Sequence, residues 1–281
     1  MSFRRFTAHR AAVAGAVVVG LLWLLALLAP WLAPYDPAGF TRMGLVPPGS
    51  EHWLGTDAIG RDVFSRLLFG ARLSLGVAML AVLVAVSIGT AVGLVAGFAG
   101  GAMDTALMRG VDLLLAFPRL FLALLAIALW GPSIWLLTLV LGLTGWMSTA
   151  RLVRTQVLSL REQDFVTAGR ALGVPTPRLL LRHVLPHCTA PLLVAATLMV
   201  GNTILAESAL SFLGLGVQVP GASWGAMLNE ARGEWRSAWW LATFPGLLIT
   251  LTVLAHNLVG DGLRDLLDPR LPVGPERSTS P

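Results

Sequence analysis

Lysine is absent from this 281-residue sequence, so all 20 basic residues are arginines. A P-loop nucleotide site needs the lysine of the G-x-x-x-x-G-K-[ST] motif to hold the β and γ phosphates. The absence excludes a P-loop ATPase in this chain, and it excludes Schiff-base chemistry as well. If ATP and magnesium drive the protein's work, partner subunits have to bind them. We expect no cofactor in this chain itself.

Charged residues and cysteines are also scarce. Charged residues make up 12% of the chain, hydrophobic residues make up 56%, and the mean hydropathy is +0.75. Soluble domains carry roughly 25% charged residues, so this composition indicates a protein of the lipid bilayer. The single cysteine, Cys188, excludes an intrachain disulfide. The arginines are spread along the chain rather than gathered in one patch, which argues against a nucleic-acid partner.

Six hydrophobic stretches are long enough to cross a bilayer, which takes about 20 apolar residues in a helix. They predict an all-α, polytopic membrane protein. The first is longer than the apolar part of a signal peptide, so we expect it to remain as a helix. The six stretches are Ala11 to Ala33, Ser74 to Ala99, Val111 to Trp130, Ser133 to Val153, Ala190 to about Leu213, and Ala238 to about Val259.

The arginines predict the direction of these spans, because cytoplasmic segments carry an excess of positive charge. An even number of spans places both termini on one side. With a cytoplasmic N-terminus, fourteen of the 20 arginines lie at the cytoplasmic side and six lie outside. We therefore expect both termini in the cytoplasm.

The same reading divides the chain into segments. Residues 1–50 hold the first span and the start of an outer loop, and residues 51–73 form an amphipathic interfacial segment. Residues 74–262 form the main transmembrane domain, with a cytoplasmic loop at 154–189, and residues 263–281 form a cytoplasmic tail. The interfacial prediction depends on Phe64, Leu68 and Ala71, which recur near helical spacing.

Local rules resolve the loop at 154–189 into two short helices. The first runs from about Gln163 to Leu172 and ends at Gly173, which is suited to the left-handed conformation of a helix C-terminus. The second begins with Thr176 as N-cap and Pro177 as first residue. Pro186 is expected to interrupt that helix where the chain enters the membrane again.

The loop resembles the EAA loop of ABC importer permeases, E-A-A-x3-G-x9-I-x-L-P. Thr167-Ala168-Gly169, Gly173 and Leu185-Pro186 stand at that spacing, with Thr167 in place of the usual Glu and Gly169 in place of Ala. Further segments between about residues 52 and 270 are similar to the C-type permeases of dipeptide, oligopeptide and nickel importers.

The resemblance implies a type I ABC importer permease fold in the inner (plasma) membrane of a bacterium. It implies a second, non-identical permease, two ATP-binding subunits and an extracytoplasmic solute-binding protein as partners. It also implies peptides as cargo, with nickel and glutathione left open. The residues expected to couple the chain to the ATPases are Thr167, Ala168, Gly169, Ala171, Leu172, Gly173, Leu185 and Pro186.

Polar and small residues inside the spans give further candidates. Glycines at 89, 93 and 97 line one helix face and predict close helix packing, within this chain or with another subunit. Asn202 and Glu207 are candidate pathway or gate residues, since an ionisable group in a membrane span is costly. The alternative role for Glu207 is structural, as a hydrogen-bonding group that does not line a pathway.

No spacing of residues predicts a metal site or an enzyme activity. His183 and His187 lie four residues apart without a set of further ligands around them. The rival function of another class is a self-sufficient, proton-coupled secondary transporter with Glu207 as proton carrier. The internal repeat that is typical of many such carriers is not evident.

Overall fold

The computed structural model describes residues 9–41, 43–218, 221–234 and 236–267. Within these ranges every regular element is a helix, apart from one isolated antiparallel bridge between Thr56 and Asp62. The all-α prediction is confirmed. Five helical segments in the described ranges are long and apolar enough to cross a membrane, and a bent pair of helices makes a sixth if the two are counted as one span.

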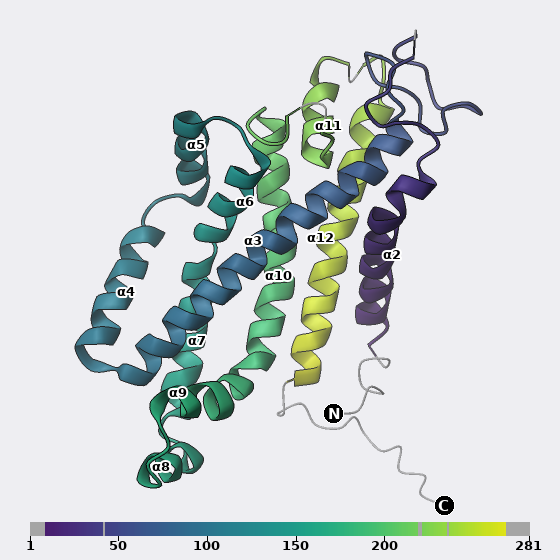
Figure 1. Ribbon diagram of the computed structural model, residues 1–281. Helices are drawn as coiled ribbons and strands as arrows, with labels where there is room; N and C mark the ends of the chain where they lie inside the picture. Colours follow the sequence, from purple (N-terminus) through teal and green to yellow (C-terminus); the bar gives the residue numbers. More distant parts are fainter. Residues whose placement is uncertain (1–8, 42, 219–220, 235, 268–281) are drawn as a thin grey trace, which may run out of the picture.

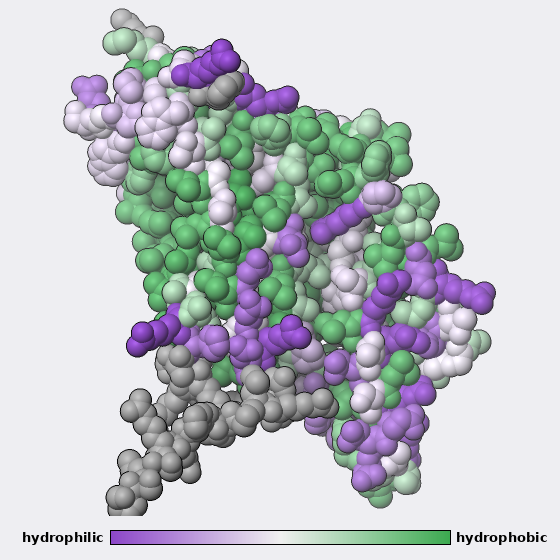
Figure 2. Space-filling view, turned by 180° about the vertical axis from the view of Figure 1, so that it is seen from behind, coloured by the Kyte–Doolittle hydropathy of each residue, from purple (hydrophilic) through white to green (hydrophobic). Residues whose placement is uncertain are grey.

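The membrane-length elements run side by side, with α3 crossing the others obliquely (Figure 1). Apolar side chains cover the middle of the molecule and polar ones gather towards its two ends (Figure 2). This is the pattern of a bundle whose flank faces lipid. The elements are α2 (Arg10–Leu32), α3 (Val63–Ala99), the successive pair α6 (Ile134–Leu143) and α7 (Trp146–Leu160), α10 (Leu185–Phe212) and α12 (Trp240–Leu267).

The expected interfacial segment 51–73 is not a separate helix. Residues 51–62 belong to a loop, and the helix that starts at Val63 continues unbroken for 37 residues as α3. The Asp62 carboxylate caps its first turn by accepting a hydrogen bond from the Ser65 N–H at 2.8 Å. Buried positions then recur every three or four residues past residue 73, so nothing in the sequence ends the helix there.

The third predicted span is broken into two helices. α4 (Gly101–Leu115) begins ten residues earlier than expected, and α5 (Arg119–Trp130) follows at an angle of 76°. Pro118 is the physical reason, because it lacks an N–H and disfavours helical geometry at Phe117. Together α4 and α5 still lead from one end of the bundle to the other (Figure 1).

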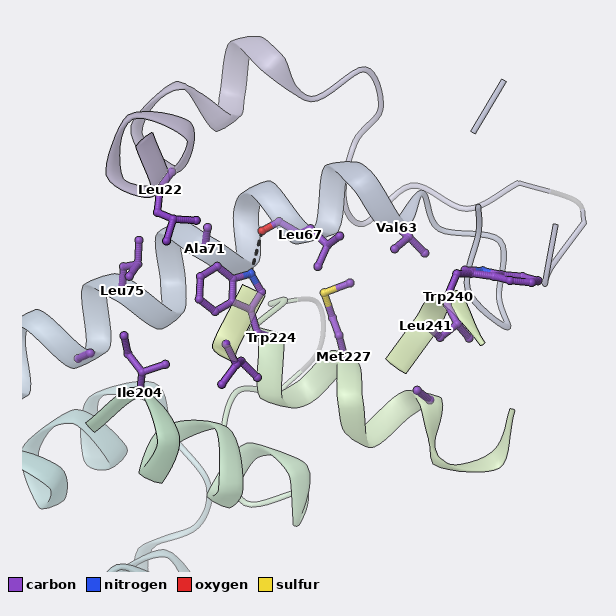
Figure 3. Close-up of a cluster of buried hydrophobic side chains, with 14 of the residues drawn as sticks. Leu22, Val63, Leu67, Ala71, Leu75, Ile204, Trp224, Met227, Trp240 and Leu241 are labelled. Atoms are coloured by element: carbon purple, nitrogen blue, oxygen red, sulfur yellow. Dashed lines mark hydrogen bonds between the residues drawn. The ribbon is translucent and has the colours of Figure 1, made fainter. Parts of the chain in front are cut away.

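A short helix, α11 (Trp224–Glu230), packs at the end of the bundle where α3 begins (Figure 1). The Trp224 side chain is fully buried among apolar residues of α2, α3 and α10 (Figure 3). Its indole N–H donates to the Leu67 carbonyl at 3.1 Å, so the polar atom of the ring is satisfied inside the cluster. α11 is thereby fixed against the start of α3.

Charged side chains also join the loop before α3 to α11. The Asp57 carboxylate lies 2.6 Å from Arg61 Nε and 2.5 Å from Arg66 Nη1. Both arginines also reach Glu230 at the end of α11, at 2.7 and 2.5 Å. Since Arg61, Arg66 and Asp57 are all buried, these four residues form a linked ion cluster rather than scattered surface pairs.

The loop at 154–189 forms α8 (Asp164–Ala171) and α9 (Thr176–Leu179), which we call the foot (residues 164–179). The foot, the start of α2 and the end of α12 lie at the same end of the bundle (Figure 1). The helix α12 runs to Leu267, so residues 263–267 are its last turns and not part of a tail. Residues 268–281 of the predicted tail lie outside the described ranges.

The glycine row of α3 packs against α7 within this chain. A Cβ added to Gly89, Gly93 or Gly97 would lie 2.6 to 2.9 Å from backbone oxygens of α7. No side chain fits in that space, so the two helix backbones touch directly. This is the intrachain alternative of the two that the spacing left open.

We expect Gly93→Ala to weaken the α3–α7 contact, because the new methyl group would lie 2.6 Å from the Ala150 carbonyl oxygen. Overpacking of this kind costs about 1–3 kcal/mol. Thermal unfolding in detergent should show an apparent Tm that is lower by at least about 3 °C. Gly76→Ala, on the same helix with nothing within 4 Å of the added Cβ, should show no decrease. Equal Tm values for both variants would contradict the proposed close contact.

Candidate functional site

The first helix of the foot ends in a defined cap. Gly173 has a φ of +73°, its N–H donates to the Arg170 carbonyl at 3.0 Å, and the Val174 N–H donates to the Gly169 carbonyl at 3.0 Å. This pair of bonds is the Schellman motif. Since a Cβ at Gly173 would meet nothing within 4 Å, the backbone conformation and not crowding favours glycine there. The structure thus has the predicted first helix and its ending.

One face of the foot is anchored to the bundle. Val166 and Leu179 are fully buried in an apolar cluster that α3, α7 and α10 complete. The Arg170 guanidinium also lies over the Phe98 ring of α3, at 4.5 Å from the centroid. A displacement of α8 therefore has to move the helices on which it is packed. The other members of the cluster are Leu94, Val153, Val157, Val184 and Cys188.

The opposite face of α8 is exposed and carries mainly small side chains. Thr167, Ala168 and Ala171 are exposed, and Leu172 is 83% exposed. The Thr167 hydroxyl donates to the Asp164 carbonyl at 2.9 Å, so it bonds its own helix where a glutamate would extend outward. Gly169 faces inward, where a Cβ would lie 2.9 Å from Leu179 of α9. This face of α8 therefore presents one exposed leucine beside small side chains.

Two details of the loop differ from the prediction. Thr176 is the first residue of α9, with Pro175 before it as N-cap and no side-chain capping bond. Pro186 does not interrupt the helix, because residues Leu180–Val184 form a π-helical turn just before it and α10 continues through it. The wider turn accommodates a residue without an N–H. The foot therefore continues into α10, with Leu185 partly buried and Pro186 exposed at the junction.

A second feature is an open groove of about 500 Å³ in the flank of the bundle. The α4–α5 break, the α6–α7 junction and α10 form its walls. Asn202 lines it and is exposed. Ten residues separate Asn202 from Phe212 at the end of α10, a rise of about 15 Å and half of a bilayer core of about 30 Å. The residues of α10 that line the groove all belong to the middle third of this helix.

Glu207 lies elsewhere and is not in the wall of this groove. Its side chain is completely buried, and its carboxylate accepts hydrogen bonds from Ser211 at 2.7 Å and from Ser74 at 3.2 Å. The Ser74 hydroxyl also accepts a hydrogen bond from the backbone N–H of Trp224 at 3.3 Å. Glu207 thus joins α10 to α3 and α11, and the structure separates the two residues that the sequence had grouped as pathway candidates.

Two described protein families match parts of this chain. Residues 89–273 match the family described as binding-protein-dependent transport system inner membrane components. The chain belongs to this family. Residues 1–48 of this transport component also match the N-terminal transmembrane domain of oligopeptide transport permease C.

Curated relatives of this transport component align over nearly its full length. The dipeptide transport system permease protein DppC of Escherichia coli K12 is 47% identical over 273 residues, covering 95% of this chain and 91% of the relative. DppC of Bacillus subtilis 168 is 41% identical, covering 96% and 85%. A di/tripeptide transport system permease of Pseudomonas aeruginosa is 43% identical, covering 96% and 91%.

Arg119 is a groove residue that the sequence analysis did not identify. If the third span were one helix, Arg119 and Asp112 would share a face, but the break at Pro118 separates them. Asp112 instead pairs with Arg151 of α7, while Arg119 lines the groove. The dipeptide Phe117-Pro118 in the middle of an apolar run was the signal that could have revealed it.

The exchange Glu207→Gln tests the structural role of the buried carboxylate. Glutamine keeps one acceptor oxygen and adds an NH2 group that can donate to a serine hydroxyl, so we expect solute uptake within about twofold of the unmodified protein and normal membrane levels. Glu207→Leu should lower the membrane level, since it leaves buried hydroxyls unpaired at a cost of about 1–3 kcal/mol. A strong loss of uptake in Glu207→Gln at a normal membrane level would instead favour a titrating carboxylate in the transport path.

Proposed function

We propose that this transport component forms one half of the membrane path of an ATP-driven importer of short peptides. Its relatives are named as dipeptide and di/tripeptide permeases, and we assign the same class of cargo to this chain. The observation that carries the mechanism is the foot, a capped helix that is anchored on one face and exposed on the other. We assign its exposed face to a groove of a separate ATP-binding subunit.

A stiff foot is a physical requirement of this mechanism. A short helix with a defined end transmits a displacement, whereas a flexible loop would absorb it. Closure of two ATP-binding subunits around ATP and magnesium would move α8. Through the apolar cluster at its anchored face, that movement would reach α3, α7 and α10 and change the access of the bundle from one side to the other.

The flank groove supports the proposal of a second permease. Polar side chains within a membrane span are costly against lipid, and they are tolerated where they line a water-filled path or a protein interface. We therefore place a second, non-identical permease against this groove. Two ATP-binding subunits and an extracytoplasmic solute-binding protein complete the assembly that the resemblance implies.

The proposed orientation follows from the position of the foot. ATP-binding subunits act in the cytoplasm, and the foot shares its end of the bundle with the start of α2 and the end of α12. Both termini are then cytoplasmic in a bacterial inner membrane, as the arginine distribution favours. The rival proton-coupled carrier is not favoured, because Glu207 is enclosed by serines and lies outside the groove.

The exchange Gly173→Val should uncouple the chain from its ATPases. Valine is strained at a φ of +73°, so the cap of α8 is lost while the bundle remains. We expect the ATP-binding subunits to co-purify at less than about a fifth of the normal amount, and uptake to fall in proportion. Gly131→Val is the matched control, since Gly131 has a φ of +81° and open space but lies at the end of α5, far from the foot. Full co-purification and uptake in Gly173→Val would overturn the docking role.

A cysteine at Leu172 tests orientation and docking together. The native Cys188 is 1% exposed and gives little background. A membrane-impermeant maleimide should label Leu172→Cys in inverted vesicles but not in intact spheroplasts, and bound ATP-binding subunits should protect it. Ile59→Cys, 56% exposed in the outer loop, should show the reverse accessibility. Labelling of Leu172→Cys from outside the cell would refute the proposed orientation.

A further inference from the structure

Arg119 holds a permanent positive charge in the flank groove without an acidic partner among the described residues. Among the described residues no carboxylate oxygen lies within 4.0 Å of its guanidinium, although seven other described arginine or histidine residues make a contact of that kind. Its Nε donates to the Thr144 hydroxyl at 3.1 Å and its Nη2 donates to the Leu141 carbonyl at 2.8 Å. These bonds fix the guanidinium but leave its charge uncompensated.

The bonds also explain how the arginine is held in the groove. The chain interrupts its helix between Leu143 and Trp146, and the Thr144 and Gly145 N–H groups bond to other carbonyls. The Leu141 carbonyl thereby accepts its short bond from Arg119, with the Thr144 hydroxyl at 3.4 Å as a second donor. Arg119 and Asn202 line the same groove.

Polar groups without a partner lie near this charge. Asn202 is exposed in the groove and makes no side-chain hydrogen bond within the described ranges, so its amide is available to a ligand or to water. The Thr149 hydroxyl also lacks a partner, but it is buried, and the Thr149 side chain packs against Gly89 of α3. The groove thus combines a fixed cation with a free amide group.

We propose that Arg119 is the transient counter-ion for the C-terminal carboxylate of the transported peptide, an inference that rests on the proposed function. The carboxylate is the one anionic group that every short peptide carries, because its pKa of about 3.5 keeps it ionised. A charge at the bilayer centre costs several kcal/mol unless it is paired or wet. A guanidinium in the path lowers this barrier for peptides of any side-chain sequence, since it contacts the backbone end.

The volume and the positive charge of the groove fit this cargo. A cavity of about 500 Å³ falls within the roughly 300–1,000 Å³ that small-molecule sites occupy. Its open side leaves the remaining wall to the second permease. A bare divalent metal ion would meet a like charge at Arg119, so the groove disfavours nickel as cargo of this path.

The test uses the complete transporter, reconstituted with its ATP-binding subunits and with saturating solute-binding protein. Uptake of dialanine and of dialanine amide is measured for the unmodified complex and for Arg119→Gln. We expect Arg119→Gln to reduce dialanine uptake at least tenfold and to change uptake of the amide by less than about twofold. Both complexes receive cargo from the same binding protein, so its own preference cancels in the ratio.

Further variants separate charge from structure. Arg119→Lys keeps the charge and should retain dialanine uptake within about threefold. Arg151→Gln, which removes an exposed arginine outside the groove, should leave both cargoes unaffected. Equal loss of both cargoes in Arg119→Gln, equal loss in Arg119→Lys, or no loss at all would overturn the proposal. Failure of ATP-dependent uptake by the unmodified complex would instead refute the proposed function itself.

Discussion

Every backbone polar group that lies in hydrocarbon has to find its partner within the protein, and this constraint organises the whole chain. It explains why each described crossing is helical. It also means that each interruption needs a local solution. At the α6–α7 junction the Arg119 side chain donates a hydrogen bond to the Leu141 carbonyl. Before Pro186 the chain forms a π-helical turn, so the helix is not broken. The interruptions are therefore the positions at which polar chemistry enters the bundle.

The two ends of the bundle are stabilised by different interactions. At the end where α3 begins, Trp224 and its apolar cluster, together with the ion cluster of Asp57, Arg61, Arg66 and Glu230, hold α3, α11 and the preceding loop as one unit. At the foot, the contacts with the bundle are mainly apolar, and one face of α8 is exposed. One end is thus closed within the chain, while the other presents the exposed face that the proposed function assigns to a partner.

Sequence patterns predicted the elements that depend on local rules. The positions of the spans, the end of α8 at Gly173 and the glycine row of α3 follow from hydrophobic length, from one left-handed backbone conformation and from a four-residue spacing. The patterns failed where tertiary contacts decide. Glu207 could not be separated from Asn202 because their different surroundings come from α3 and α11, which are distant in sequence. Pro118 was overlooked because a hydropathy window averages over a single residue.

The continuity between the foot and α10 sets how motion is scaled inside the protein. The helix α10 has 28 residues, about 42 Å at 1.5 Å per residue, and the serines around Glu207 and the helix α11 contact it near the end opposite the foot. A rod that pivots about a fixed end moves least near the pivot. Under the proposed mechanism, with Asn202 about a third of the way from that pivot, α10 would move at the groove by about one third of its displacement at the foot. A large displacement of the foot would then produce a small change in the width of the groove.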